Sequence, residues 1–375
     1  MAFIELHILQ NFAPSNLNRD ETNTPKSTQF GGYRRARISS QCLKRQIRKH
    51  PDFATVIEEA GGDVGVRTKR IAGDIVTRLL ASGKTVDLSQ QVAERLLGLA
   101  KLKIAKAFKT QYLLYLGKRE IDQLAAIADD YWDELSSKEK DFSKEVGDAV
   151  KEALGKKSYA ADVALFGRMV ADNKEVNVDA ACQVAHALST NEVKMEMDFF
   201  TAVDDFLGAD EQGSDMMGSV YFNSSCYYRY AQINLDKLVE NLGKNDKELI
   251  LASVKGFLKA SVDARPTGKQ NSSAAQNPVC YVRVCVRKSG SPWSLANAFA
   301  KPVHPNRDGN SNIEADSAIQ LEQFMQQLTS MYGNDGFVFN GASSYLNDEK
   351  LAGNYKPVNK LVDEAVIAVN EVIGG

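Results

Sequence analysis

The sequence is poor in the residues from which metal sites and disulfide frameworks are built. Five cysteines are spread over 375 residues without a Cys-x-x-Cys pair, and an odd number at such spacings favours reduced thiols. The four histidines include no His-x-x-x-His pair and none beside a cysteine in a zinc pattern. A metal site would have to be assembled by the fold from dispersed side chains, so we expect neither a metal nor a cofactor.

Long apolar runs are also missing. There is no stretch of about 18 apolar residues, and Glu5 and His7 interrupt the N-terminal residues where a signal peptide needs an unbroken apolar run. With 43% hydrophobic and 25% charged residues, the composition is that of an ordinary globular chain. We therefore expect a cytoplasmic protein that does not contact a membrane.

Familiar catalytic motifs are absent as well. The sequence has no Gly-x-Ser-x-Gly, no P-loop, no dinucleotide fingerprint and no His-Glu-x-x-His. The best remaining candidates are adjacent carboxylates such as Asp20 and Glu21, because a carboxylate pair can hold a metal or act as a base. No histidine partner is visible for them, so we expect a protein that is not an enzyme and has no catalytic residues.

Charge is balanced in total but segregated along the chain. Lys and Arg number 46 against 48 Asp and Glu, a net charge of −2, yet residues 22–51 contain eight cations and no acid. Two further acid-free stretches lie between Glu94 and Glu120 and between Asp263 and Asp308. Such segregation lets one face bind a polyanion, or lets basic and acidic faces pair between copies, although basic runs are also common on solvated surface.

The first basic stretch contains a predicted helix of special interest. Residues 33–38 have strand character, Ser39 and Ser40 are typical N-cap residues, and Pro51 would end the helix. Leu43 and Ile47, four residues apart, would point into a core.

The remaining positions of this helix are polar. Gln41, Lys44 and Arg48 share one flank, and Arg45 and Lys49 form a second cationic row. Free N–H groups at the helix start, two hydroxyls and cations one turn apart are suited to consecutive phosphates. The alternative is a capped surface helix with solvated side chains.

The rest of the chain predicts an α+β fold. Residues 53–154 have mostly helical spacing and are typical of a helical insertion, and a further helix is predicted over 179–188. Strand patterns occur at 226–235 and 279–286, and helical patterns at 246–260, 316–332 and 358–372. This order resembles a ferredoxin-like or RNA-recognition sheet with insertions.

Two extended arms between about residues 190 and 224, joined by a polar loop, predict a β-hairpin. Phe199 and Phe200 are adjacent on one arm, and neighbours on a strand point to opposite faces. One of them is therefore available for another contact, unless the two pack against two different layers.

Six motifs, in order along residues 2–300, resemble the CasC-like family, the backbone subunit of the type I-E CRISPR Cascade complex. They are Ser15-Asn-Leu-Asn-Arg-Asp20, Phe30-Gly-Gly-Tyr-Arg-Arg-Ala-Arg-Ile-Ser-Ser-Gln-Cys-Leu-Lys-Arg45, Gly167-Arg-Met169, Asp198-Phe-Phe-Thr-Ala-Val-Asp-Asp205, Tyr228-Arg-Tyr-Ala-Gln-Ile-Asn-Leu235 and Leu295-Ala-Asn-Ala-Phe299.

The resemblance implies a hand-like architecture: a modified RNA-recognition palm, a helical finger insertion and a β-hairpin thumb. The palm would start with residues 1–52, which include the basic helix, and the finger domain would span 53–158. The palm would resume over 159–304, with the thumb at about 190–224. Residues 305–375 would form a C-terminal helical segment that completes it.

The resemblance also implies site residues. Those expected to contact RNA are Arg19, Lys26, Ser39, Ser40, Gln41, Lys44, Arg45, Arg48, Arg168, Met169, Phe199, Phe200, Thr201 and Lys269. Those expected to contact target DNA, in the finger domain, are Lys101, Lys103, Lys106 and Lys109.

The implied function is a non-catalytic RNA-binding subunit. Several copies would assemble as a filament along one CRISPR RNA, kink it at regular intervals with their thumbs and present it to target DNA. Other Cascade subunits and a recruited helicase-nuclease would be further partners. Two alternatives remain: a metal-dependent endoribonuclease that uses Asp20, as in the related type III backbone subunits, and a general single-strand RNA binder outside CRISPR.

Overall fold

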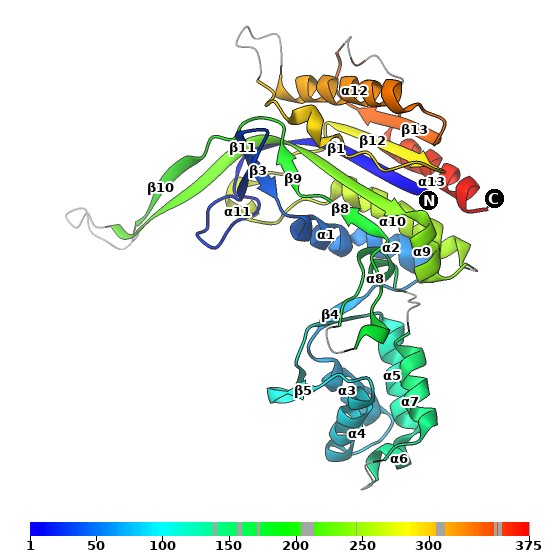
Figure 1. The fold of residues 1–375 in the computed structure, drawn as a ribbon. Coiled ribbons are helices and arrows are strands. Elements are labelled where there is room, and N and C mark those ends of the chain that lie inside the picture. The colour runs from blue at the N-terminus through cyan, green and yellow to red at the C-terminus, as the bar shows by residue number, and fades with distance from the viewer. Residues whose placement is uncertain are drawn as a thin grey trace. The chain divides into compact units, whose positions relative to one another are not determined.

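The computed structural model describes residues 1–137, 141–155, 160–170, 173–203, 214–244, 246–304, 312–348, 351 and 355–374. The chain divides into two compact units (Figure 1). The first comprises Met1–His50, Val184–Gln232 and Phe257–Gly375, and the second comprises Pro51–Gln183 and Ile233–Gly256. Among the described helices, none is both long enough and apolar enough to span a membrane.

A large sheet forms the centre of the first unit, with strand order β13-β12-β1-β11-β9-β3-β2. The strands are β1 (Phe3–Ser15), β2 (Ser27–Phe30), β3 (Tyr33–Ile38), β9 (Ala187–Ser189), β11 (Ser214–Asn234), β12 (Tyr281–Arg287) and β13 (Phe337–Ser344). β12 pairs antiparallel with β1 and with β13, and β3 pairs antiparallel with β2 and with β9. The predicted α+β class is therefore confirmed.

The central strand β1 is buried along most of its length, because other elements cover both of its faces. α12 (Ile313–Tyr332), α13 (Val358–Gly374) and the short helix Leu295–Phe299 belong to this unit, and α12 packs on β1 and on the short helix. The apolar side chains of α12 and the short helix join those of the sheet in one core that contains Leu9, Tyr228, Tyr281 and Leu321, and α13 packs on β12 and β13. All five cysteines are free thiols, as predicted.

One prediction of secondary structure is wrong, and another is incomplete. Residues 179–188, predicted as a helix, contain β8 (Cys182–Val184) and β9. The C-terminal segment 305–375 contains α12 and α13 where helices were predicted, and it also contributes β13 to the edge of the sheet. At residues 179–188, pairing with strands distant in the sequence outweighs local helix propensity, which is a weak signal by itself.

The predicted hairpin is formed by β10 (Glu196–Val203) and the first half of β11, which pair antiparallel from Glu196 with Phe222 to Val203 with Ser214. It extends away from the rest of the first unit (Figure 1). The loop between its arms, residues 204–213, lies outside the described residues.

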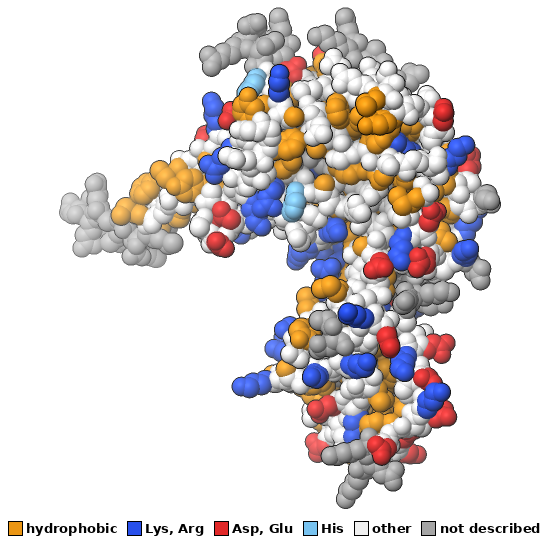
Figure 2. All heavy atoms as spheres, in the orientation of Figure 1, with side chains coloured by type: hydrophobic (Ala, Val, Ile, Leu, Met, Phe, Trp, Pro, Cys, Tyr) orange, Lys and Arg blue, Asp and Glu red, His pale blue; other side chains and the backbone are white. Residues whose placement is uncertain are grey.

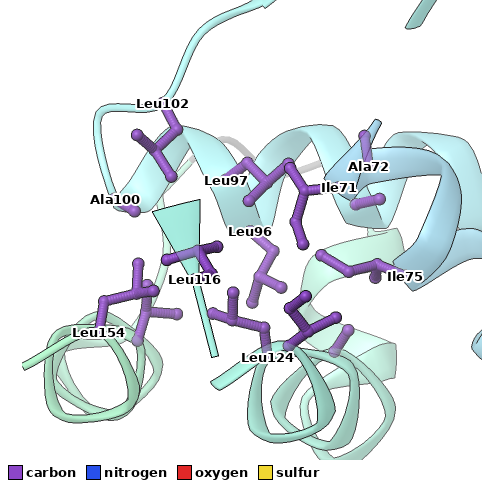
Figure 3. Packing of buried hydrophobic residues seen from close by; sticks show 14 of the residues in the cluster. Ile71, Ala72, Ile75, Leu96, Leu97, Ala100, Leu102, Leu116, Leu124 and Leu154 are labelled. Atoms are coloured by element: carbon purple, nitrogen blue, oxygen red, sulfur yellow. The ribbon is translucent and has the colours of Figure 1, made fainter. Parts of the chain in front are cut away.

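The second unit is mainly helical, as predicted for the insertion. Its helices are α2 (Pro51–Glu59), α3 (Ile71–Ala81), α4 (Val86–Leu99), α5 (Lys118–Asp130), α6 (Trp132–Ser136), α7 (Lys144–Ala153), α8 (Ala161–Phe166) and α9 (Leu235–Leu242). β4 (Val66–Thr68) pairs with β7 (Leu114–Leu116), and β5 (Ile104–Ala105) pairs with β6 (Lys109–Thr110). Ile75, Leu96 and Leu124 point into a shared apolar interior (Figure 3).

This unit is larger than the predicted finger segment 53–158. It also contains residues 160–183 and 233–256, which the resemblance assigns to the palm. Asn241 on α9 explains part of the difference, because its side-chain amide donates to the backbone oxygens of Ala164 and Asp179. α10 (Lys247–Asp263) contains the boundary between the units after Gly256. Contacts of this range leave no local pattern in the sequence.

Candidate nucleic-acid interface

The basic helix predicted from the sequence is α1 (Ser40–Lys49). Ser39 is its N-cap in extended conformation, and the Ser39 hydroxyl oxygen accepts from the N–H of Cys42 at 3.2 Å. Leu43 and Ile47 are buried, as their four-residue spacing predicted. The helix ends before Pro51, which begins α2. The predicted cap, core face and end are therefore confirmed.

The cations of α1 differ in exposure. Arg45 and Lys49 are exposed, Lys44 is half-buried, and Arg48 is only 7% exposed. The sequence predicts that Arg48 holds phosphate beside Lys44, but its position next to Ile47 turns it toward the protein interior. Arg45 thus replaces Arg48 as the outward cation beside Lys44. Figure 2 shows Lys and Arg side chains gathered over this part of the first unit.

The polar residues at the start of α1 have separate roles. Ser39 is buried and its hydroxyl caps the helix, so this hydroxyl already has a partner within the chain. Ser40 is half-buried, and Gln41 is exposed. The first turn therefore presents Ser40 and Gln41, rather than Ser39, to the surroundings.

The neighbouring strand β3 carries three arginines with different environments. Arg34 is exposed and donates to the Ser27 hydroxyl. Arg35 is fully buried and donates to the backbone oxygens of Ser189 at 2.9 Å and Phe299 at 2.6 Å. Arg35 therefore links β3 to β9 and to the short helix Leu295–Phe299, although it belongs to the basic stretch. Arg37 is half-buried at the start of α1.

One residue at this site is not predicted from the sequence. The backbone N–H of Ser40 donates to Nδ1 of His186 at 3.1 Å, and a guanidinium nitrogen of Arg37 lies 3.3 Å from the same Nδ1. His186 comes directly before β9, and β9 pairs with β3 in a register that places Ala187 opposite Ile38. Only this register brings His186 to α1, so no local signal could have identified it.

The loop between β1 and β2 contains Arg19, Asp20 and Lys26. Arg19 is exposed and donates to the side-chain oxygen of Asn23, and Lys26 is half-buried. The carboxylate of Asp20 accepts from the hydroxyl and N–H of Thr22 and from the N–H of Thr24. The hydrogen bond from the Thr22 hydroxyl is the main reason that the pKa of Asp20 lies below its usual value. Asp20 thus organises its own loop.

Arg168 and Met169 follow the glycine that ends α8 in the second unit. Arg168, expected to contact RNA, is 4% exposed and pairs with the buried carboxylate of Glu120 at 2.7 Å. It also donates to the backbone oxygens of Val176 and Leu154. These contacts hold the Arg168 side chain inside the unit, and its contact with RNA stays a prediction. Met169 is 85% exposed and remains a candidate for contact.

Both phenylalanines of the hairpin are exposed, Phe199 at 60% and Phe200 at 41%, and Thr201 next to them is exposed too. The register assigns them to opposite faces, with Phe199 opposite Ser219 and Phe200 opposite Gly218. Figure 2 shows apolar side chains along the arms of the hairpin.

Each face of the hairpin carries further apolar side chains. The face of Phe199 includes the exposed side chains of Met197, Met217 and Tyr221. The face of Phe200 includes Val220 and Phe222 and borders a groove. Residues that line this groove are Pro14, Ser15, Asn16, Asp198, Phe200, Val220, Phe222, Lys269, Ser272 and Ser273. Lys269 is exposed here, so a cation accompanies the apolar wall.

The four finger lysines lie in the second unit on and beside the ribbon of β5 and β6. Lys101, Lys103, Lys106 and Lys109 are all exposed. The backbone is left-handed at Lys101, before the ribbon, and at Ala107 and Phe108, between its strands, and the N–H of Gln111 donates to the oxygen of Lys103. These turns project four cations from a short segment, an arrangement suited to a polyanion.

Comparison with known proteins gives a consistent result. A family model described as CT1975-like protein matches residues 4–364. The chain is similar to one in a solved structure described as a CRISPR RNA-guided surveillance complex, pre-nicking, with TM-score 0.83 and 32% identity over 98% of this chain and 100% of that chain. A second CRISPR RNA-guided surveillance complex matches with TM-score 0.73 and 28% identity over 98% and 99% of the two chains. No curated protein matches the sequence.

These matches extend over nearly the whole chain and agree with the six sequence motifs. The described residues contain no group of three or more His, Cys, Asp and Glu side chains placed to hold a metal ion. The chain therefore belongs to the CT1975-like family and is a CasC-like backbone subunit of a CRISPR Cascade complex.

Proposed function

We propose that this protein binds a CRISPR RNA without cleaving it, and that several copies assemble along the guide and present it to target DNA. The proposal is supported by two features that occur together in the first unit. One unit combines a capped helix with outward cations and a projecting hairpin with exposed aromatic rings on both faces. The first feature recognises a phosphate backbone, and the second recognises unstacked bases.

The α1 surface binds the backbone and not the base edges. Lys44 and Arg45 supply charge, and Ser40 and Gln41 supply polar groups beside the positive end of the helix dipole. None of these groups selects one base over another when it contacts phosphate, so the same subunit can be reused along any guide sequence. Specificity then comes from pairing between guide and target, as in other RNA-guided complexes.

The hairpin kinks the guide. Phe199 and Phe200 insert apolar rings beside the strand, and an apolar wedge between bases unstacks and bends a nucleic acid. A kink at each subunit divides the guide into short segments, which spares guide and target from winding continuously around each other. Lys269 in the groove beside Phe200 offers a phosphate contact next to the kink.

Copies of the subunit assemble by repeating one contact between neighbours. A head-to-tail contact that does not close produces a helical filament, which suits repeated subunits on a linear RNA. The lysines at 101, 103, 106 and 109 bind target DNA in the same particle. Other Cascade subunits complete it, and a recruited helicase-nuclease cuts the target.

Catalysis by Asp20 is the competing hypothesis. Its carboxylate is exposed and ionised at neutral pH, so it could bind a metal. One of its oxygens, Oδ1, however, already accepts hydrogen bonds from Thr22 and Thr24, which order the loop. A backbone subunit that keeps its guide intact is therefore the favoured function.

The test compares assembly of charge variants. The chain is co-expressed with a CRISPR RNA and its partner subunits, and particles are weighed by native mass spectrometry. The wild type should form a multi-copy particle with intact RNA, whereas Lys44→Gln/Arg45→Gln should not. The control Lys144→Gln/Lys151→Gln removes two exposed cations from α7 in the second unit and should assemble normally.

Three results would count against the proposal. A wild type that stays monomeric and free of RNA would remove its basis. Copy numbers unrelated to guide length would favour a general single-strand RNA binder. Guide cleavage that needs a divalent cation and is lost in Asp20→Ala would favour the nuclease.

A further inference from the structure

His186 is held at the start of α1 by the sheet. The pairing of β9 with β3 sets Leu188 opposite Arg37 and Ala187 opposite Ile38, so His186 lies alongside Ser39. Its Nδ1 accepts from the Ser40 N–H at 3.1 Å. The first N–H of the helix is therefore satisfied by a side chain from another strand, while Ser39 caps the N–H of Cys42.

Two donors converge on the same nitrogen of His186. Besides the Ser40 N–H, a guanidinium nitrogen of Arg37 lies 3.3 Å from Nδ1. A nitrogen that faces two donors must carry its lone pair and no proton, so the ring proton is on Nε2. Within the described part of the chain, Nε2 has no hydrogen-bond partner, and the side chain is exposed.

The surroundings keep this ring neutral. The groups that face it are Arg37 on β3, Lys26 before β2 and the first turn of α1. Partial burial, followed by the charges of Arg37 and Lys26, lowers the pKa of His186 below its ordinary value. The imidazole therefore offers a neutral N–H donor in the middle of a cationic surface.

We propose that His186 has two roles in the RNA site, as a positioning residue for α1 through Nδ1 and as a direct hydrogen-bond donor to the RNA backbone through Nε2–H. The inference rests on the proposed function, because it adds a ligand to the same surface. It identifies a contact that carries no charge. Neutralising Lys44 or Arg45 reduces the number of counterions that the RNA releases on binding. Removing the neutral imidazole of His186 leaves that number unchanged.

The test separates the two roles by substitution. His186→Asn places an amide oxygen where Nδ1 stands, so it keeps the acceptor for Ser40 but lacks a donor at the position of Nε2. His186→Phe removes both groups. The full-length chain is titrated with a fluorescent single-stranded RNA of guide length at several salt concentrations, and thermal unfolding of each variant is followed in parallel.

The expected results differ between variants. His186→Asn should unfold at the wild-type temperature and bind RNA roughly tenfold more weakly, the effect of removing one hydrogen bond to a charged oxygen. Its slope of log Kd against log salt should equal that of the wild type. Lys44→Gln should reduce this slope by about 0.7, the value for one phosphate contact on a single strand. His186→Phe should both bind more weakly and unfold at a lower temperature.

Each contrary result is decisive. Wild-type affinity in His186→Asn would overturn the direct contact, and wild-type affinity in His186→Phe would overturn both roles. A reduced salt slope in His186→Asn would show that His186 acts as a cation, which also overturns the inference. A wild-type chain that binds no RNA would instead refute the proposed function itself, so the two failures are distinguishable.

Discussion

The ring of Phe200 occupies the space that a side chain at Gly218 would need. The two residues are directly paired across the hairpin, and a Cβ atom on Gly218 would stand 2.5 Å from Cζ of Phe200. Phe200 therefore lies over the opposite strand, and glycine at 218 is what permits this position. The conformation of one ring proposed to contact RNA thus depends on the smallest residue of the other arm.

Gly218→Ala should displace Phe200 without unfolding the protein. The new methyl group requires the ring to swing away, since real Cβ atoms do not approach another atom to 2.5 Å. A displaced wedge should kink the guide less well, so we expect weaker periodic protection of the RNA from nucleases. Ser219→Ala, opposite Phe199, is the matched control and should keep the wild-type pattern. Identical protection in both variants would contradict the role given to Phe200.

A buried histidine should make the stability of the first unit depend on pH. His7 is fully buried, and its Nδ1 lies 2.9 Å from the Tyr228 hydroxyl. That hydroxyl oxygen also accepts from the Leu295 N–H, so His7 belongs to a buried hydrogen-bonded cluster. Burial, followed by the charges of Arg283 and Arg287, lowers the pKa of His7 to about 3.

The sign of the effect follows from linkage. Between pH 6.5 and pH 3 the unfolded chain binds a proton at His7 and the folded chain does not, so stability is full above pH 6.5 and falls as the pH is lowered. The total loss is on the order of 5 kcal/mol, at about 1.4 kcal/mol for each pH unit. Denaturant unfolding between pH 7 and pH 4 measures it. His7→Asn does not titrate, so it should reduce the slope of the free energy of unfolding against pH by the equivalent of about one bound proton. An unchanged slope would contradict the assignment to His7.

Substitution of Arg168 should lower stability, whereas substitution of its neighbour Met169 should weaken RNA binding. Arg168→Met leaves the carboxylate of Glu120 buried beside an apolar side chain, and breaking a buried ion pair in this way costs about 3–5 kcal/mol. Trp132 lies in the second unit, so its fluorescence during chemical unfolding reports the loss. Met169→Ala should unfold like the wild type and weaken guide binding. Equal stability of the two variants would mean that the ion pair contributes little.

Local sequence signals predicted a large part of the first unit. The Ser39 cap, the buried spacing of Leu43 and Ile47, and the stop before Pro51 all act within one turn of a helix, so their effects are visible in the sequence. The sequence did not predict that Arg48, Arg35 and Arg168 are buried. A basic motif does not show whether an arginine side chain faces solvent or a buried carbonyl oxygen. For Arg35 and Arg168, burial is decided by Ser189, Phe299 and Glu120, which are far away in the chain.

Long-range pairing accounts for the other differences. Residues 179–188 have helical composition, but β9 pairs with β3 and β11. The same pairing brings His186 to α1, and it also explains why that residue was not predicted as part of the site. β13 likewise owes its place at the sheet edge to its partner β12. Register between strands distant in sequence is the information that a single sequence does not display.

The lysines of the β5–β6 ribbon should bind target DNA through charge alone. Lys101, Lys103, Lys106 and Lys109 are exposed on one short segment of the second unit, so each can neutralise a phosphate. Changing all four to Gln should weaken binding of the assembled particle to duplex DNA of any sequence. The slope of log K against log salt should fall by about 0.9 for each phosphate that is no longer neutralised, hence by up to about 3.6.

Assembly on the guide should be unchanged in this quadruple variant, because α1 and the hairpin belong to the other unit. Lys118→Gln/Lys144→Gln/Lys151→Gln is the control: these lysines are exposed in the same unit, but Lys118 pairs with Glu58 and Lys151 with Asp148. Neighbouring carboxylates repel phosphate, so removing these cations should leave the salt slope nearly unchanged. An equal fall in slope in both variants would assign the effect to the net charge of the unit and not to the ribbon.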